Sequence, residues 1–120
     1  MWIFTDYGFF SIVQKPNEPG LTVRARSRED LARFCKLAAT VTGSVMPDII
    51  DNEGTDYPFR VRLPHPVVSA TLAHTIEHID YNNFKGRVAK TLGSDRAHLL
   101  MDVWATMARV GRNTIKRQRW

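Results

Sequence analysis

The chain has 120 residues, of which 43% are hydrophobic and 24% charged, and its formal net charge is +5. These values are ordinary for a globular protein; they exclude wholesale disorder, and the length suits one domain with its own core. No apolar run approaches the length that crosses a bilayer, and an acid at Asp6 is untypical of a secretory signal. Cys35 is the only cysteine, which excludes an internal disulfide and favours a cytoplasmic setting.

The first quarter of the chain is predicted to form short strands. Residues 2–5 and 9–14 are rich in aromatic and β-branched types on either side of a bend at Asp6-Tyr7-Gly8. Residues 15–20 hold two prolines and a glycine, which favour turns. Residues 21–26 then alternate apolar with polar or basic side chains, which indicates a half-buried strand with a basic outer face.

The middle of the chain is predicted to form a helix, a loop and a strand. Ser27 suits the N-cap of the helix and Gly43 suits its end. Its apolar stripe is Leu31, Phe34, Cys35, Ala38 and Val41. Residues 44–56, with four acids, are expected to form an acidic loop, and residues 57–63 alternate as a further strand does.

Three helices are predicted after that strand. Pro64 and Pro66 open the first, which is expected to run to about Ile79. Its inward side chains are expected to be Val68, Leu72, Ile76 and Ile79. Asn82 or Asn83 begins the next helix, which Gly93 ends; Ser94 begins the last, which is expected to end near Gly111. The apolar side of that last helix is Leu99, Leu100, Val103, Met107 and Val110.

The element order is therefore β-β-β-α-β-α-α-α. Strands followed by helices favour the α+β class, with a small antiparallel sheet of about four strands packed on about four helices. We expect a single domain over residues 1–111 and a basic C-terminal tail over residues 112–120.

One pattern suggests catalysis. His74-Thr75-Ile76-Glu77-His78 matches the inverted zinc-peptidase signature, in which two histidines one helical turn apart bind zinc beside a glutamate. No glutamate follows Glu77 to complete such a site, and both histidines fall opposite the apolar stripe of their helix. His74 and His78 are thus weak metal candidates, and a metal-dependent hydrolase is the weakest of three hypotheses. No catalytic residue is assigned and no cofactor is expected. Cys35 is interpreted as a buried small hydrophobe.

Basic residues are the main binding candidates. Arg24, Arg26 and Arg28 follow one strand, and Arg60 and Arg62 another, so five guanidinium groups share one surface if these strands are neighbours. The second set lies at the C-terminus and comprises Arg109, Arg112, Lys116, Arg117, Arg119 and the terminal Trp120. Both sets suit RNA or DNA, and both equally suit an acidic protein. The predicted strands lack the aromatic pair that an RNA-recognition sheet uses for stacking.

A pattern of Asp-Tyr followed closely by Phe occurs three times, each where a turn meets an ordered element. In the third copy, Tyr81, Phe84 and Lys85 are either anchors of a turn or contacts for a partner, because aromatic side chains serve both roles. Both readings remain open from the sequence.

Several blocks resemble a group of small bacterial and phage proteins. The opening block contains Trp2-Ile3-Phe4-Thr5 and Gly8-Phe9-Phe10-Ser11-Ile12-Val13, and a later block is Asp80-Tyr81-Asn82-Asn83-Phe84-Lys85. The resemblance runs over most of the chain and implies a fold unit and a bacterial or mobile-element setting, without an activity.

The resulting hypothesis is a non-catalytic protein that binds a macromolecule. A phage or mobile-element inhibitor of a host defence complex, such as a CRISPR effector, would fit the size and the resemblance. The alternative is a direct RNA- or DNA-binding protein that uses the basic strand face and the tail. The expected partner is a protein or a protein–nucleic-acid complex, with no membrane.

Overall fold

A computed structural model gives the structure of residues 1–52 and 54–118, with side chains described through Arg112. The chain divides into two compact units, Met1–Asp80 and Tyr81–Trp120. The first holds the sheet and two helices, and the second holds two helices. None of the helices in the described ranges is long and apolar enough to cross a membrane.

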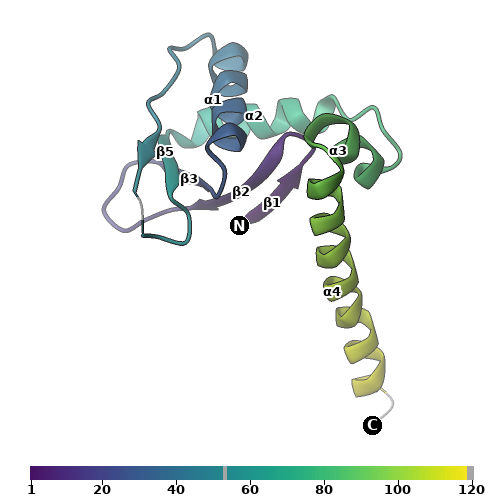
Figure 1. Cartoon of the computed structure of the whole chain (residues 1–120). Coiled ribbons are helices and arrows are strands. Elements are labelled where there is room, and N and C mark those ends of the chain that lie inside the picture. Colours follow the sequence, from purple (N-terminus) through teal and green to yellow (C-terminus); the bar gives the residue numbers. More distant parts are fainter. Residues whose placement is uncertain (53, 119–120) are drawn as a thin grey trace. The chain divides into compact units, whose positions relative to one another are not determined.

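The first unit is built on a five-stranded antiparallel sheet, which confirms the α+β class (Figure 1). Its strands are β1 (Trp2–Thr5), β2 (Gly8–Val13), β3 (Leu21–Ala25), β4 (Ile50–Asp51) and β5 (Phe59–Leu63), in the spatial order β1-β2-β3-β5-β4. Strand β4 corrects the prediction that residues 44–56 form only a loop. Two residues are too few to show the alternation that identifies a strand in a sequence.

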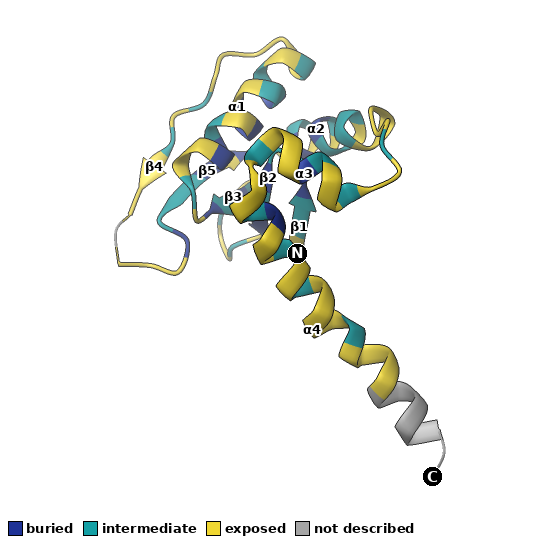
Figure 2. Cartoon of the chain, turned by 45° about the vertical axis from the view of Figure 1, so that its right-hand side comes forward, coloured by how far each residue is buried: buried dark blue, intermediate teal, exposed yellow. Residues whose placement is uncertain are grey.

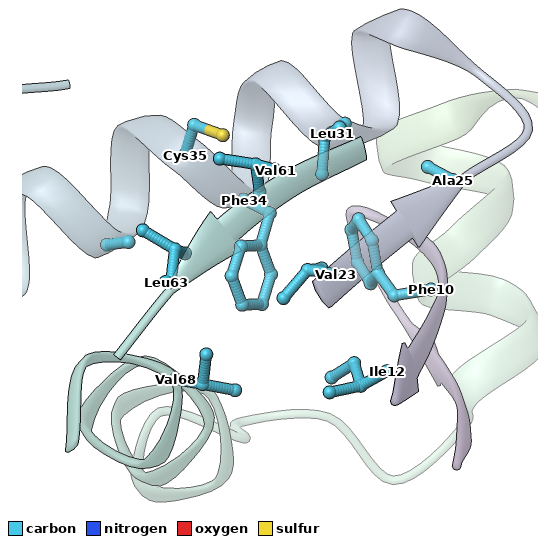
Figure 3. Packing of buried hydrophobic residues seen from close by; sticks show 11 residues of the cluster. Phe10, Ile12, Val23, Ala25, Leu31, Phe34, Cys35, Val61, Leu63 and Val68 are labelled. Carbon is cyan, nitrogen blue, oxygen red and sulfur yellow. The ribbon is translucent and has the colours of Figure 1, made fainter. Parts of the chain in front are cut away.

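The core of this unit lies between one face of the sheet and two helices, α1 (Arg28–Thr42) and α2 (His65–Glu77). Figure 3 shows Phe10 and Val23 of the sheet facing Phe34 of α1 and Val68 of α2. Because side chains alternate along a strand, every second residue of β2, β3 and β5 points to the other face, on which neither helix of this unit packs.

Helix α1 begins and ends as predicted. The Ser27 side chain accepts a hydrogen bond from the Asp30 N–H at 3.2 Å, and Gly43 ends the helix with a left-handed φ of 66°. The predicted stripe faces the core, since Leu31, Phe34, Cys35 and Ala38 are all buried.

Helix α2 corrects part of the predicted stripe. Val68 is buried and Leu72 partly buried, but Ile76 is exposed and Ile79 lies beyond the last residue of the helix. Thr71 is fully buried instead. Its hydroxyl donates to the Val67 carbonyl at 2.7 Å, so the threonine buries its methyl group without leaving an unpaired polar atom. Apolar periodicity alone does not reveal such a residue.

The second unit consists of α3 (Phe84–Leu92) and α4 (Ser94–Gln118). Asn83, one of the two predicted caps, begins α3, and its side chain accepts a hydrogen bond from the Gly86 N–H at 3.0 Å. Helix α4 does not end near Gly111 but continues to Gln118, so most of the predicted tail belongs to this helix. A single glycine inside a helix costs only about 1 kcal/mol, so Gly111 alone is not sufficient to end α4.

Candidate functional site

The predicted arginines meet on the outer face of the sheet. Strands β3 and β5 are neighbours, and Arg24 lies directly opposite Arg60, while Thr22 lies opposite Arg62. Directly opposed residues of an antiparallel pair project to the same face, so Arg24, Arg60 and Arg62 share the face that the helices of this unit leave open. Arg26 follows β3 and joins them through Tyr57, since its guanidinium lies 5.1 Å from the centre of that ring.

Arg28 does not join this group. It is the first residue of α1 and is exposed, and within the described part of the chain no contact links it to the other arginines. Four of the five predicted strand arginines are thus gathered on one surface.

On the same outer face of the sheet, the neighbouring strands β1 and β2 carry aromatic side chains. Phe4 lies opposite Phe9, and their rings stack at 4.5 Å with an angle of 12° between planes. Trp2, which is 70% exposed, meets Phe9 edge-on at 6.2 Å. The prediction that the strands lack an aromatic pair is therefore wrong. The sequence Phe9-Phe10 does not show which ring points outward, and only the register with β1 assigns Phe9 to the outer face.

Tyr57 connects the aromatic and the basic halves. It is buried, its ring lies 6.4 Å from that of Phe9, and the Arg24 guanidinium lies 4.6 Å from its centre. We call the whole surface the arginine–aromatic face. It comprises Trp2, Phe4, Phe9, Arg24, Arg26, Tyr57, Arg60 and Arg62.

The arginines on this face differ in how well they are paired. Arg62 forms an ion pair with Glu18 at 3.0 Å. Arg24 donates to Ser11 Oγ at 2.7 Å and Arg60 donates to the Tyr57 carbonyl at 3.2 Å, both of which are neutral acceptors. Among the described residues, neither Arg24 nor Arg60 has a carboxylate within ion-pair distance, and the Nε atom of each is buried without a hydrogen-bond partner.

This arrangement favours an anion. Like charges directly opposite in a sheet are destabilising, and buried donors without partners are costly. A phosphate or carboxylate bound by the terminal nitrogens of Arg24 and Arg60 would relieve the repulsion between the two charges, because guanidinium groups bind such anions through N–H donors.

The histidine pair does not assemble a metal centre in the described chain. The rings of His74 and His78 stack at 3.8 Å, and His78 Nδ1 lies 2.9 Å from the His74 carbonyl oxygen. No three His, Cys, Asp or Glu residues gather closely enough to hold a metal in the described ranges. The pair alone therefore lacks the third protein ligand that a catalytic zinc site requires.

Cys35 is a core residue, as predicted. It is fully buried, and burial raises the pKa of its thiol to about 11. A thiol that holds its proton at neutral pH is a poor nucleophile.

The third Asp-Tyr block forms a separate cluster within the second unit. Tyr81 and Phe84 are half-buried with ring centres 6.1 Å apart, and the Arg87 guanidinium lies 4.9 Å from the centre of the Tyr81 ring. Lys85 is exposed, with Nζ 3.5 Å from Met101 Sδ of α4. These contacts are compatible with turn anchoring, and contact with a partner stays a prediction.

The C-terminal basic set is described in part. Arg109 and Arg112 are exposed on α4. Lys116 and Arg117 fall within the bounds of α4, but their side chains lie outside the described residues, as do Arg119 and Trp120 altogether.

Comparisons with known proteins add no assignment. No family model, no curated protein and no solved structure matches the chain. The functional argument therefore depends on the geometry of the arginine–aromatic face.

Proposed function

We propose that the protein is a non-catalytic binding protein that takes a single-stranded nucleic acid on its arginine–aromatic face. The observation that carries this proposal is the combination of stacked, partly exposed rings at Phe4 and Phe9 with arginines that have no carboxylate partner in the described chain. Sequence-tolerant binding of single strands uses these two components, aromatic platforms for the bases and cationic side chains for the backbone.

The order of side chains across the sheet supports a single strand rather than a duplex. Aromatic residues occupy β1 and β2, and arginines occupy β3 and β5. A single-stranded nucleic acid that crosses the sheet from β1 toward β5 would place bases on Trp2, Phe4 or Phe9 and a phosphate near Arg24 and Arg60. A duplex keeps its bases stacked inside, so it would leave the rings without a partner.

The charge distribution supports the same ligand class. Residues 82–120 carry nine basic and two acidic residues, so the second unit adds a sequence-independent attraction for a polyanion. The cytoplasm, where a lone cysteine stays reduced, is the compartment that fits this proposal. Inhibition of a host defence complex stays a prediction from size and resemblance, and no contact described above favours it.

The direct test is fluorescence anisotropy of a labelled oligothymidylate and a labelled RNA of mixed sequence with the full chain, at several salt concentrations, beside a duplex of equal length. We expect tighter binding to the single strands and an affinity that falls steeply with salt. The double variant Arg24→Ala with Arg60→Ala should weaken binding far more than Arg28→Ala, an exposed arginine outside the face. Absence of binding at low salt, or equal effects of the two changes, would reject the proposal.

The aromatic half has its own matched control. Trp2→Leu removes an exposed tryptophan from the face, and Trp104→Leu removes one of similar exposure from α4. We expect only Trp2→Leu to weaken binding of single strands, because stacking contributes about 1–3 kcal/mol per base.

A further inference from the structure

We propose that Tyr57 positions the arginines of the arginine–aromatic face for phosphate and does not itself stack on a base. The proposal rests on the nucleic-acid function proposed above and assigns one role within it. From Asn52 to Asp56 every described residue of the loop that leads into β5 is exposed, as its yellow colour in Figure 2 shows. Tyr57, the next residue, keeps only 8% of its surface accessible. The ring is therefore covered by neighbouring side chains, and these neighbours indicate its role.

Two of the neighbours are guanidinium groups. Those of Arg24 and Arg26 lie 4.6 Å and 5.1 Å from the centre of the Tyr57 ring. Both distances fall within the about 6 Å over which an aromatic ring attracts a cation, and arginine is the cation most often found there. One ring therefore holds two of the four arginines of the face.

The backbone of Tyr57 holds a third arginine. Arg60 donates to the Tyr57 carbonyl at 3.2 Å, and Thr55 Oγ1 donates to the same oxygen at 2.9 Å. The ring and the carbonyl are both neutral, so they orient guanidinium groups without cancelling their charge. Glu18 acts differently on Arg62, because its carboxylate neutralises that charge at 3.0 Å. The arginines that Tyr57 holds keep their full charge for a phosphate.

Arg26 depends on Tyr57 more than Arg24 does. Arg24 also donates to Ser11 Oγ at 2.7 Å. Arg26 is exposed, and the described part of the chain gives it no hydrogen bond and no ion pair. An exposed arginine samples many rotamers, and ordering such a side chain during binding opposes association. The contact with the ring orders Arg26 before a ligand arrives.

Burial argues against a stacking role for Tyr57 itself. A base stacks on an aromatic side chain whose ring face is accessible. The Tyr57 ring is covered by two guanidinium groups and has Phe9 6.4 Å away, whereas Trp2 is 70% exposed. The aromatic residues of the face therefore divide into a group that can meet bases, at Trp2, Phe4 and Phe9, and a residue that orders the arginines.

The test compares two labelled probes by fluorescence anisotropy with the full chain. One is an oligothymidylate, and the other is an abasic oligomer of equal length, which keeps the phosphates and lacks the bases. We expect Tyr57→Leu to weaken binding of both probes about tenfold, because the arginines must then be ordered during binding. Tyr57→Phe keeps the ring and should bind like the unmodified protein. Trp2→Leu, the matched control, should weaken binding of the oligothymidylate only.

The outcomes separate this proposal from the function on which it rests. If the unmodified chain binds both probes and Tyr57→Leu does not weaken binding of the abasic oligomer, only the positioning role is overturned. Equal losses in Tyr57→Leu and Tyr57→Phe would also overturn it, because the ring would then not be the active part. If the unmodified chain binds neither probe, the proposed function is rejected together with the positioning role. Far-UV circular dichroism reports whether each variant folds.

A measurement on the unmodified protein does not depend on the folding of a variant. Nitrogen-15 relaxation of the arginine Nε–H groups compares Arg26 with Arg28 in the absence of ligand. Both side chains are exposed and neither has an ion pair in the described chain, but only Arg26 lies against a ring. We expect a higher order parameter for Arg26 than for Arg28. Equal order parameters would overturn the proposal, since Tyr57 would then not order Arg26.

Discussion

Arg24 of β3 and Arg60 of β5 are direct cross-strand partners, and the Nε atom of each is buried without a hydrogen-bond partner among the described residues. Two like charges in this relation lower the stability of a sheet, while the same two charges belong to the face proposed above to bind phosphate. The pair is therefore expected to favour binding at the expense of folding stability.

Replacing Arg60 by Met should separate these two effects. We expect the free energy of unfolding to stay constant or rise by about 0.5 kcal/mol, because a cross-strand repulsion is removed and the apolar stem is kept. The Tyr57 carbonyl keeps a donor, since Thr55 Oγ1 donates to it at 2.9 Å. Urea denaturation and anisotropy should show unchanged or higher stability together with weaker binding. A loss of stability of more than about 1 kcal/mol would indicate a structural role for Arg60.

Phe9 and Phe10 should respond to substitution in opposite ways. Phe10 is fully buried, so Phe10→Ala should lower the free energy of unfolding by about 3–5 kcal/mol. Phe9→Ala removes a partly exposed ring and should cost much less stability, but it should weaken binding of a single strand by about 1–3 kcal/mol. Urea denaturation of Phe9→Ala measures the loss of stability, and fluorescence anisotropy measures the loss of affinity for a single-stranded nucleic acid. Unchanged affinity in this variant would contradict the stacking role of the face.

These neighbours also show what the sequence predicts and what it does not. Alternation along residues 21–26 and 57–63 was sufficient to predict two strands with basic outer faces, and the cap at Ser27 and the stop at Gly43 are confirmed. The register between β1 and β2 cannot be predicted from the alternation of apolar and polar residues. Phe9 and Phe10 are consecutive aromatic residues, so either ring could point to the outer face. The aromatic half of the candidate site was missed for this reason.

Non-local pairing explains the remaining differences. Arg24 of β3 and its partner strand β5 are separated in the sequence by the whole of α1. The sequence therefore predicted a shared arginine surface only if these two strands are neighbours. Thr71 in the core of α2 depends on a hydroxyl that is satisfied within its own helix, and Gly111 inside α4 depends on the residues that follow it. Each case is a tertiary or medium-range interaction that overrides a local preference.

Tyr7 should make stability fall at alkaline pH. Its hydroxyl lies 2.8 Å from Thr75 Oγ1, which itself donates to the Thr71 carbonyl, so Tyr7 is the donor of this bond. Burial raises the pKa of Tyr7 above its ordinary value. The folded state then keeps the proton where the unfolded state loses it, so the contribution is intact below the ordinary pKa of about 10 and is lost as the pH rises through the folded pKa.

Comparison with Tyr7→Phe isolates this contribution. At neutral pH the variant should lose about 1 kcal/mol, the usual value of one hydrogen bond. Between neutral pH and about pH 11 its stability should fall less steeply than that of the unmodified protein, as followed by urea denaturation. The Cys35 thiol titrates in both proteins, so its effect cancels in the comparison. Parallel pH profiles would show that Tyr7 ionises equally in both states.

Two glycines should respond with opposite signs to replacement by alanine. Gly43 ends α1 with φ at 66°, where a side chain is strained, so Gly43→Ala should lower the free energy of unfolding by about 1 kcal/mol. Gly111 lies inside α4 with open space around its Cβ position, so Gly111→Ala should stabilise the C-terminal half of this helix by up to about 1 kcal/mol. Amide hydrogen exchange should show slower exchange after residue 107 in Gly111→Ala. Unchanged exchange there would mean that α4 ends near Gly111 in solution, which is the end that the sequence pattern predicts.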